Sequence, residues 1–198
     1  MERADRFYFP RDRVAYIVGR ATLRRRLANY LGADPRSLTF SYGSAGKPML
    51  AETHASSLAF NLSHSGGYAL LGVSSDYPLG VDTEVEDHTI EIRQLTKRFF
   101  STDERSAILA LPPSNQVTAF YRTWTRKEAF LKALGAGLNL PLDQFTVTTD
   151  LNGPVKMTAI DWSPGEAADW SLASFTVGDR LPGAVALRGE LVGLEFYE

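Results

Sequence analysis

One short stretch, PLGVDTEVED at residues 78–87, restricts the fold strongly. Its apolar residues predict a buried strand over 79–83, and two acids, Asp82 and Glu84, stand at the end of that strand. Side chains at positions i and i+2 of an extended strand point to the same side, so both carboxylates share one small volume. Two such charges about 5 Å apart repel by about 3 kcal/mol at an effective dielectric of about 20. The fold must therefore supply a proton, a cation or bulk water at this place.

Hydrophobic periodicity predicts alternating groups of helices and strands. Helices are expected over residues 11–31, 90–111 and 117–134, the second of them interrupted near Phe99 and Phe100. The strand-like segments lie at 38–42, 58–62, 68–74, 79–83, 145–150, 155–160, 170–177 and 184–189. This order is an α+β pattern, and two similar halves would produce it, although no motif repeats at the level of residues.

The first helix carries apolar residues at a spacing of three to four positions, which predicts a face that contacts the core. Gly32 is placed to end this helix. The residues of the predicted face are Val14, Ile17, Val18, Ala21, Ala28 and Leu31.

Composition excludes several classes of protein. The chain has 198 residues, a formal net charge of -2 and no cysteine, so it offers no basic field for nucleic acid and no disulfide or thiolate chemistry. The N-terminus has no apolar signal core, and no apolar run approaches the ~20 residues that span a bilayer. We therefore expect a cytoplasmic protein that binds neither nucleic acid nor membrane.

A third carboxylate lies on the helix predicted over 117–134. At about 100° per residue, Glu128 falls in the middle of the apolar arc, and Lys132 lies one turn further at its edge. A carboxylate on the core-facing side is costly to bury without a partner. One interpretation is an ion pair between Glu128 and Lys132 that reaches water. The other brings Glu128 to Asp82 and Glu84 as ligands of Mg²⁺, with Lys132 as a phosphate partner.

Two further stretches carry candidate phosphate ligands. In the first, Gly46 permits close backbone approach, Lys47 offers a positive charge and Pro48 stiffens the exit. The alternative is an ordinary turn with a solvated lysine. In the second, Ser63 and His64 end a strand before a Gly-Gly turn, where they would either donate to a phosphate or serve as structural hydrogen-bonding groups.

Other motifs favour structural roles. Glu104 stands three residues after Ser101, the spacing of a capping box at a helix start. The glycines Gly135 and Gly137 follow the helix predicted over 117–134, where they would end it and let a ligand approach the backbone.

Taken together, these motifs resemble the surfactin-type 4'-phosphopantetheinyl transferases, in the family's order and spacing. The resemblance implies two pseudo-symmetric α+β halves, residues 1–78 and 79–198, with the active site in the cleft between them. It implies transfer of the 4'-phosphopantetheine arm of coenzyme A to a serine of an acyl or peptidyl carrier protein, with release of adenosine 3',5'-bisphosphate. The matching stretches are GKPML (46–50), FNLSHSGGYALLGVS (60–74), GVDTE (80–84), KRFFSTDE (97–104) and FYRTWTRKEAFLKALGAGL (120–138).

By position, the resemblance assigns Asp82, Glu84 and Glu128 to a magnesium site. Glu128 would also accept the proton of the carrier serine, and Lys132 would contact the phosphates of coenzyme A. The remaining coenzyme contacts that it implies are Arg3, Gly46, Lys47, Pro48, Ser63 and His64.

Two features depart from the family pattern. Family members carry further residues upstream of Arg3, so a truncated chain, a misassigned start and a naturally short form all stay open. Thr83 stands where an aliphatic residue is usual, and it should point away from the two acids that flank it.

Two other functions remain as alternatives. A magnesium-dependent nuclease or phosphohydrolase would use the same acids, although the chain has no basic stripe. A binding module without activity would keep the fold, although all three acids and Lys132 are present. The carrier partner is expected to be acidic and the enzyme to be a monomer. Four basic residues are candidate contacts for this carrier, and the alternative for each is a side chain that is simply solvated. They are Lys97, Arg98, Arg122 and Arg126.

Overall fold

The structure is a computed structural model, and it describes residues 5, 8–137, 140–178 and 180–197. The helices are α1 (Pro10–Leu31), α2 (Ile92–Phe99), α3 (Thr102–Ala110) and α4 (Pro113–Leu134), with short 3₁₀ helices at Glu52–His54, Leu142–Gln144 and Glu166–Asp169. The strands are β1 (Phe40–Tyr42), β2 (Pro48–Leu50), β3 (Ala59–Ser65), β4 (Tyr68–Ser74), β5 (Leu79–Thr83), β6 (Phe145–Val147), β7 (Met157–Ile160), β8 (Trp170–Val177) and β9 (Leu181–Arg188). The predicted α+β class is confirmed.

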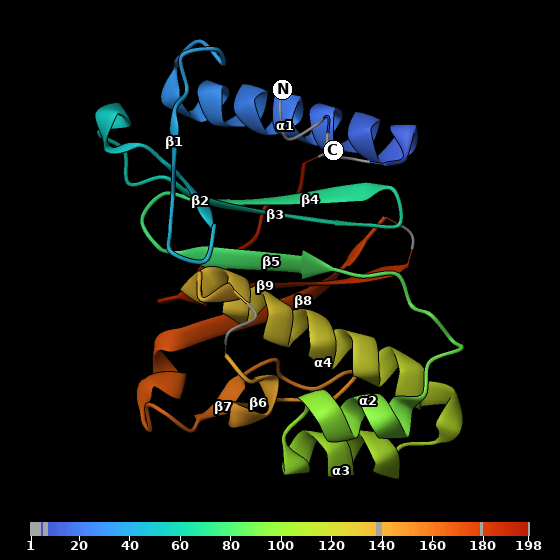
Figure 1. The fold of residues 1–198 in the computed structure, drawn as a ribbon. Helices are drawn as coiled ribbons and strands as arrows, with labels where there is room; N and C mark the ends of the chain where they lie inside the picture. Colours follow the sequence, from blue (N-terminus) through green and yellow to red (C-terminus); the bar gives the residue numbers. More distant parts are fainter. Residues whose placement is uncertain (1–4, 6–7, 138–139, 179, 198) are drawn as a thin grey trace.

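The described strands pair in antiparallel groups. β1 pairs with β2, β3 with β4, and β6 with β7, while β9 lies between β5 and β8. Figure 1 shows α1 over β3 and β4, and α4 on the opposite side of β5 and β9. The β3–β4 sheet and the β5–β9–β8 sheet share a core, in which Leu79, Val81 and Val185 pack with Ala59 and Leu70. This contact packs β3 and β4 against β5.

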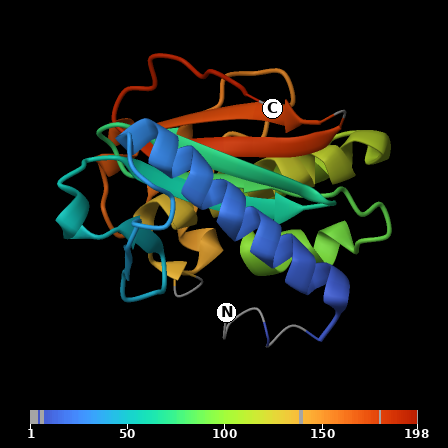
Figure 2. The same ribbon diagram turned by 90° about the horizontal axis from the view of Figure 1, so that it is seen from above.

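Helix α1 crosses the strands below it, as Figure 2 shows from above. It ends as predicted at Gly32, which takes φ 60° and donates its N–H to Ala28 and Asn29. The predicted face is wrong in its N-terminal part, because Val14 and Val18 are more than half exposed. Ala28 of the predicted face is buried, and it packs with Leu38 and Phe60 together with Leu23 and Leu27, which were not predicted.

The predicted interruption near Phe99 and Phe100 is confirmed. Phe100 is buried and extended, with φ -110° and ψ 151°, so it ends α2. Its ring stacks on Phe120 of α4 at a centroid distance of 5.1 Å. The buried aromatic ring therefore fixes the point at which α2 gives way to α3.

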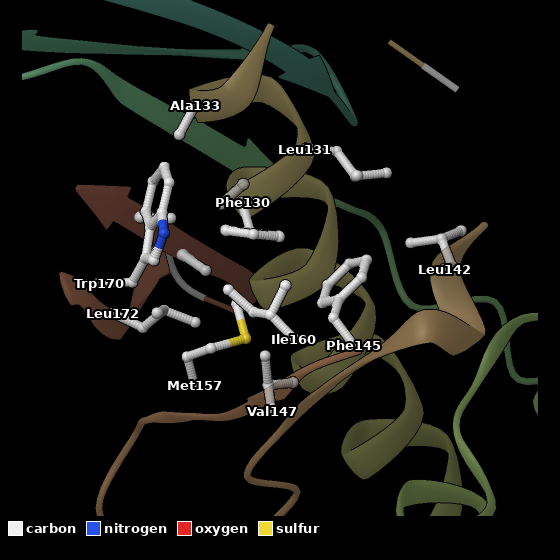
Figure 3. Packing of buried hydrophobic residues seen from close by; sticks show 13 residues of the cluster. Phe130, Leu131, Ala133, Leu142, Phe145, Val147, Met157, Ile160, Trp170 and Leu172 are labelled. Carbon is white, nitrogen blue, oxygen red and sulfur yellow. The ribbon is translucent and has the colours of Figure 1, made fainter. Parts of the chain in front are cut away.

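Helix α4 buries one side in the largest apolar cluster of the described chain, shown in Figure 3. Phe130 lies at its centre, with ring centroids 4.8 Å from Phe145 and 4.7 Å from Trp170. Small residues, among them Ala129 and Ala133, let the helix backbone approach the sheet. The helix is thereby fixed across β5, the strand that carries Asp82.

Gly80 is the point of closest approach between α4 and β5. A Cβ atom at this position would lie 2.0 Å from the carbonyl oxygen of Ala129 and 2.3 Å from the backbone nitrogen of Ala133. Gly80→Ala is therefore expected to lower the free energy of unfolding by about 3 kcal/mol, because neither backbone atom can give way cheaply. Urea unfolding of the variant measures this loss. Gly193→Ala is the matched control, since no atom lies within 4 Å of its Cβ position; equal stability of the two variants would contradict the prediction.

None of the helices in the described ranges is long and apolar enough to cross a membrane. The division into halves at residues 1–78 and 79–198 stays a prediction.

Candidate active site

Two neighbouring strands bring the predicted acids together with two serines. Ser63 Oγ of β3 donates to Asp82 Oδ1 of β5 at 2.9 Å, and Ser65 Oγ donates to Glu84 Oε2 at 3.0 Å. Further along, the backbone N–H of Val81 donates to the side-chain oxygen of Asn61 at 2.8 Å. These side chains of β3 therefore tie its C-terminal half to β5.

Lys132 reaches this cluster from α4. Its Nζ donates to Asp82 Oδ1 at 2.6 Å and to Ser63 Oγ at 3.0 Å. Lys132 thus forms its ion pair with Asp82. One interpretation of the sequence expected a pair with Glu128, one turn back along the same helix, and that interpretation is wrong. Helix α4 and strand β5 consequently meet through charged groups as well as through apolar packing.

The three acids affect one another electrostatically. Burial raises the pKa of Asp82 above its usual range, against the opposing effect of Lys132. Burial, followed by the charge of Asp82, raises the pKa of Glu84, and the same two causes raise the pKa of Glu128. Asp82 at the end of β5, Glu84 just beyond it and Glu128 of α4 are therefore partly buried and near enough to interact electrostatically.

The donor set has the chemistry that a hard divalent cation prefers. Asp82 Oδ2 is buried and, among the described residues, has no hydrogen-bond partner. Oxygen ligands of this kind suit Mg²⁺, which keeps several waters and takes few protein ligands. In the described ranges, however, no three Asp, Glu or His side chains converge closely enough to hold an ion. Binding would therefore require a side-chain rearrangement among the acids, whereas Asp82 Oδ2 already lacks a partner among the described residues.

A pocket of about 250 Å³ opens beside these groups. Its walls come from residues 45–48, from Asn61 and Leu62 of β3, and from α4 with the turn that follows it. Glu128 and Lys132 both line the pocket, so the pocket is continuous with the acid cluster. The sequence-predicted residues Gly46, Lys47 and Pro48 also lie in its wall.

The side chain of Lys47 has a role that the sequence did not indicate. Its Nζ donates to the carbonyl oxygens of Leu79 and Ala133, both at 2.9 Å. Burial lowers the pKa of Lys47 to about 8, so the alternative of a solvated lysine is wrong. The ammonium group ties the 45–48 turn to β5 and to the end of α4.

Of the two glycines after α4, Gly135 ends the helix as predicted. Gly135 takes φ 69° and donates its N–H to Leu131 O. A Cβ at Gly135 would lie 3.1 Å from Lys47 Cδ, and a Cβ at Gly137 would lie 3.1 Å from Ala45 Cβ. The atoms that lie close to these glycines belong to Ala45 and Lys47 of the pocket wall.

His64 lies against α1. A Cβ at Gly19 of α1 would lie only 2.9 Å from His64 Nε2, so the ring fits against the helix backbone at a glycine. Burial, followed by the charge of Lys132, lowers the pKa of His64, which favours the neutral imidazole. Arg3, the remaining predicted coenzyme contact, lies outside the described residues.

Comparison with known families identifies the superfamily of the chain. A family model described as the 4'-phosphopantetheinyl transferase superfamily matches residues 78–186, and one described as 4'-phosphopantetheinyl transferase, N-terminal, matches residues 1–76. The chain belongs to this superfamily. The resemblance read from the sequence motifs is thereby confirmed.

Several curated relatives are members of the same superfamily. The 4'-phosphopantetheinyl transferase HetI of a Nostoc species is 38% identical over 96% of this chain and 77% of that protein. The 4'-phosphopantetheinyl transferase Sfp of Bacillus subtilis is 34% identical over 81% of this chain and 69% of that protein. The human L-aminoadipate-semialdehyde dehydrogenase-phosphopantetheinyl transferase is 29% identical over 94% of this chain and 65% of that protein.

Lys127, the neighbour of Glu128 in the sequence, is a buried charged residue that pairs with Glu104. The capping box of Ser101 and Glu104 is confirmed at the start of α3. Both carboxylate oxygens of Glu104 also accept from Lys127 Nζ at 2.7 Å, and both side chains are fully buried. On the helical wheel, Lys127 falls about 60° from Trp124, inside the apolar arc. This signal could have identified the buried lysine from sequence.

The basic residues considered for carrier docking differ in exposure. Arg126 is only 1% exposed, and its guanidinium donates to Ser174 Oγ at 2.9 Å. Burial lowers the pKa of Arg126 to about 10. Its assignment as a carrier contact is therefore wrong. Arg122 is half-buried and donates to the carbonyl of Leu151, whereas Lys97 and Arg98 of α2 are exposed.

Proposed function

We propose that this chain transfers the 4'-phosphopantetheine arm of coenzyme A to a serine hydroxyl of an acyl or peptidyl carrier protein. One observation carries the proposal. Asp82, Glu84 and Glu128 gather with Lys132 beside a pocket, where two strands and a helix meet. The superfamily to which the chain belongs supports the same activity.

Three acids, Asp82, Glu84 and Glu128, are proposed to hold Mg²⁺. The buried and unpartnered Asp82 Oδ2 supports this assignment. The ion, when bound, would polarise the phosphates of coenzyme A as a Lewis acid and orient them. Glu128 faces both the acids and the pocket, so it has access to a serine that enters from outside.

The transfer is a single displacement at phosphorus. Glu128 accepts the proton of the carrier serine, directly or through one water, and the serine oxygen forms a bond to the β-phosphorus of coenzyme A. The bond from this phosphorus to the bridging oxygen breaks, and adenosine 3',5'-bisphosphate leaves with the bond electrons. Lys132 is proposed to move from Asp82 to the phosphates, where its charge stabilises the leaving group.

The remaining site residues are proposed to bind the coenzyme. Gly46 and Pro48 would contact it through backbone groups of the pocket wall, and Ser63 and His64 would donate to a phosphate. Lys47 is proposed to contact the coenzyme through the third N–H of its ammonium group, because the other two N–H groups already donate to backbone carbonyls. Arg3 is proposed as a further basic contact.

The pH dependence of the rate tests the role of Glu128. Only the carboxylate can accept a proton, and burial together with Asp82 raises the pKa of Glu128 above the ordinary value of 4.5. A bound cation would lower this pKa again, so we expect kcat to fall on the acidic side along a limb whose midpoint moves to lower pH as the Mg²⁺ concentration is raised. Initial loading rates at saturating coenzyme A and carrier, measured from alkaline to acidic pH at several Mg²⁺ concentrations, give this midpoint. A kcat with no acidic limb, or a midpoint that does not depend on Mg²⁺, would contradict the role.

Carrier loading tests the activity itself. The purified chain, coenzyme A and Mg²⁺ are incubated with apo-carriers from fatty-acid, polyketide and nonribosomal-peptide systems, and each carrier is weighed by intact mass spectrometry. At least one carrier should gain one phosphopantetheine group, and a carrier whose serine is replaced by alanine should gain none. Cleavage of coenzyme A with no gain on any carrier would favour a phosphohydrolase. Binding of coenzyme A in calorimetry with neither reaction would favour a binding module.

The exposed pair Lys97 and Arg98 remains the proposed contact for an acidic carrier. A monomeric state and a cytoplasmic location stay predictions.

A further inference from the structure

Strand β3 presents two serines to two acids with the same spacing. Ser63 and Ser65 are two residues apart, and so are Asp82 and Glu84. Because side chains two apart on a strand point to the same side, each serine meets one acid. Ser63 shares its acid with Lys132. Ser65 donates to Glu84, which lies just beyond the end of β5 and whose backbone N–H still donates to Pro182 O at 3.2 Å.

The hydroxyl of Ser65 makes two hydrogen bonds that fix its direction. It accepts from the backbone N–H of Val85 at 2.9 Å, and it lies 3.0 Å from Glu84 Oε2. A serine hydroxyl has one proton, and the backbone N–H can only donate. The proton of Ser65 therefore goes to Glu84, and one carboxylate oxygen is held while the other stays available.

The turn after Ser65 is shaped to bring the hydroxyl to this place. Gly66 takes φ 58°, and a Cβ there would lie 2.5 Å from Val85 Cγ2 and 3.2 Å from Leu181 Cδ2. Only a glycine lets the turn lie directly against Val85 in this backbone conformation. The contact keeps the end of β3 within hydrogen-bond distance of the segment that follows β5.

We propose that Ser65 is a positioning residue, which orients the carboxylate of Glu84 for a divalent cation. The inference rests on the proposed function, because it takes Glu84 to be a metal ligand. Groups that hydrogen-bond to metal ligands typically change metal affinity by about 10–100-fold when they are removed. Ser65→Ala is therefore expected to raise the Kd for a divalent cation by about 10-fold.

Direct binding of Mn²⁺ to the full chain, measured by electron paramagnetic resonance of the free ion, tests the proposal. Ser65→Ala should weaken binding, and Ser65→Thr, which keeps a hydroxyl, should restore it. In a Glu84→Gln background, Ser65→Ala should change the Kd little, since the group that it orients is no longer a carboxylate. Ser74→Ala is the matched control, because Ser74 lies in the same hairpin and accepts from Tyr77 N; its Kd should equal that of the wild type.

Circular dichroism confirms that each variant is folded before binding is measured. Wild-type affinity in Ser65→Ala, or the same loss in the Glu84→Gln background, would overturn the proposal. A wild-type chain that binds no Mn²⁺ would overturn both this inference and the metal assignment. Binding that depends on Ser65 in a chain that loads no carrier would reject the transfer activity alone.

Discussion

Replacing Glu128 by glutamine is expected to lower the rate of carrier loading by about 10²–10⁴-fold, the usual contribution of a general base. Glutamine keeps the size of the side chain but cannot accept the serine proton. It also removes one of three charges that would hold the cation. Intact-mass measurements of apo-carrier over time give both rates in the presence of coenzyme A and Mg²⁺.

The same substitution should leave the fold intact. Burial and the charge of Asp82 raise the pKa of Glu128, so the ionised group is held in an unfavourable environment in the metal-free protein. Removing that charge is expected to leave the thermal midpoint at neutral pH equal or higher. Glu52→Gln is the matched control, because Glu52 is exposed on a 3₁₀ helix outside the acid cluster. A folded Glu128→Gln variant that loads carrier as fast as Glu52→Gln would rule out the catalytic assignment.

The largest effect on stability is expected for Glu104→Ala, a loss of about 3–5 kcal/mol in the free energy of unfolding. Removing this carboxylate leaves the fully buried ammonium of Lys127 without its anionic partner. It also removes the acceptor for the backbone N–H groups of Ser101 and Val147, at 2.9 and 2.8 Å. One side chain thus connects α3, α4 and β6, and urea unfolding measures its contribution.

Two further variants distinguish the contribution of the buried ion pair to stability from the effect of any substitution at the start of α3. Asp103→Ala changes the exposed acid next to Glu104 and is expected to alter stability by less than about 0.5 kcal/mol. The double variant Glu104→Leu with Lys127→Met should be more stable than Glu104→Ala, because it leaves no buried charge. If Glu104→Ala were no less stable than Asp103→Ala, the buried pair would have no such role.

Local sequence patterns were sufficient for the features that depend on neighbouring residues. The capping box follows from Ser101 and Glu104 three positions apart, and the helix end at Gly32 follows from the left-handed conformation that glycine favours. The hypothesis that three acids share one site came from two periodicities in the sequence. Spacing of two placed Asp82 and Glu84 together, and spacing along the helix placed Glu128 on the apolar arc.

The features that the sequence did not predict depend on contacts between distant residues. Lys47 bonds to the carbonyl of Ala133, 86 positions away, and periodicity within one element cannot indicate such a pair. Gly80 is needed because α4 crosses it, a contact that only the assembled fold creates. On α1, apolar residues occur on more than one side, so the side with Leu23 and Leu27 could not be chosen by periodicity alone.

The position of a bound cation is the sharpest test of the proposed metal site. Crystals of the protein with coenzyme A and Mn²⁺ would give an anomalous difference map that locates the ion. We predict one strong peak coordinated by carboxylate oxygens of Asp82 and Glu128 and by Glu84, directly or through water, with Lys132 moved from Asp82 to the coenzyme phosphates. A peak remote from these acids, or no peak while Lys132 still contacts Asp82 beside bound coenzyme, would contradict it.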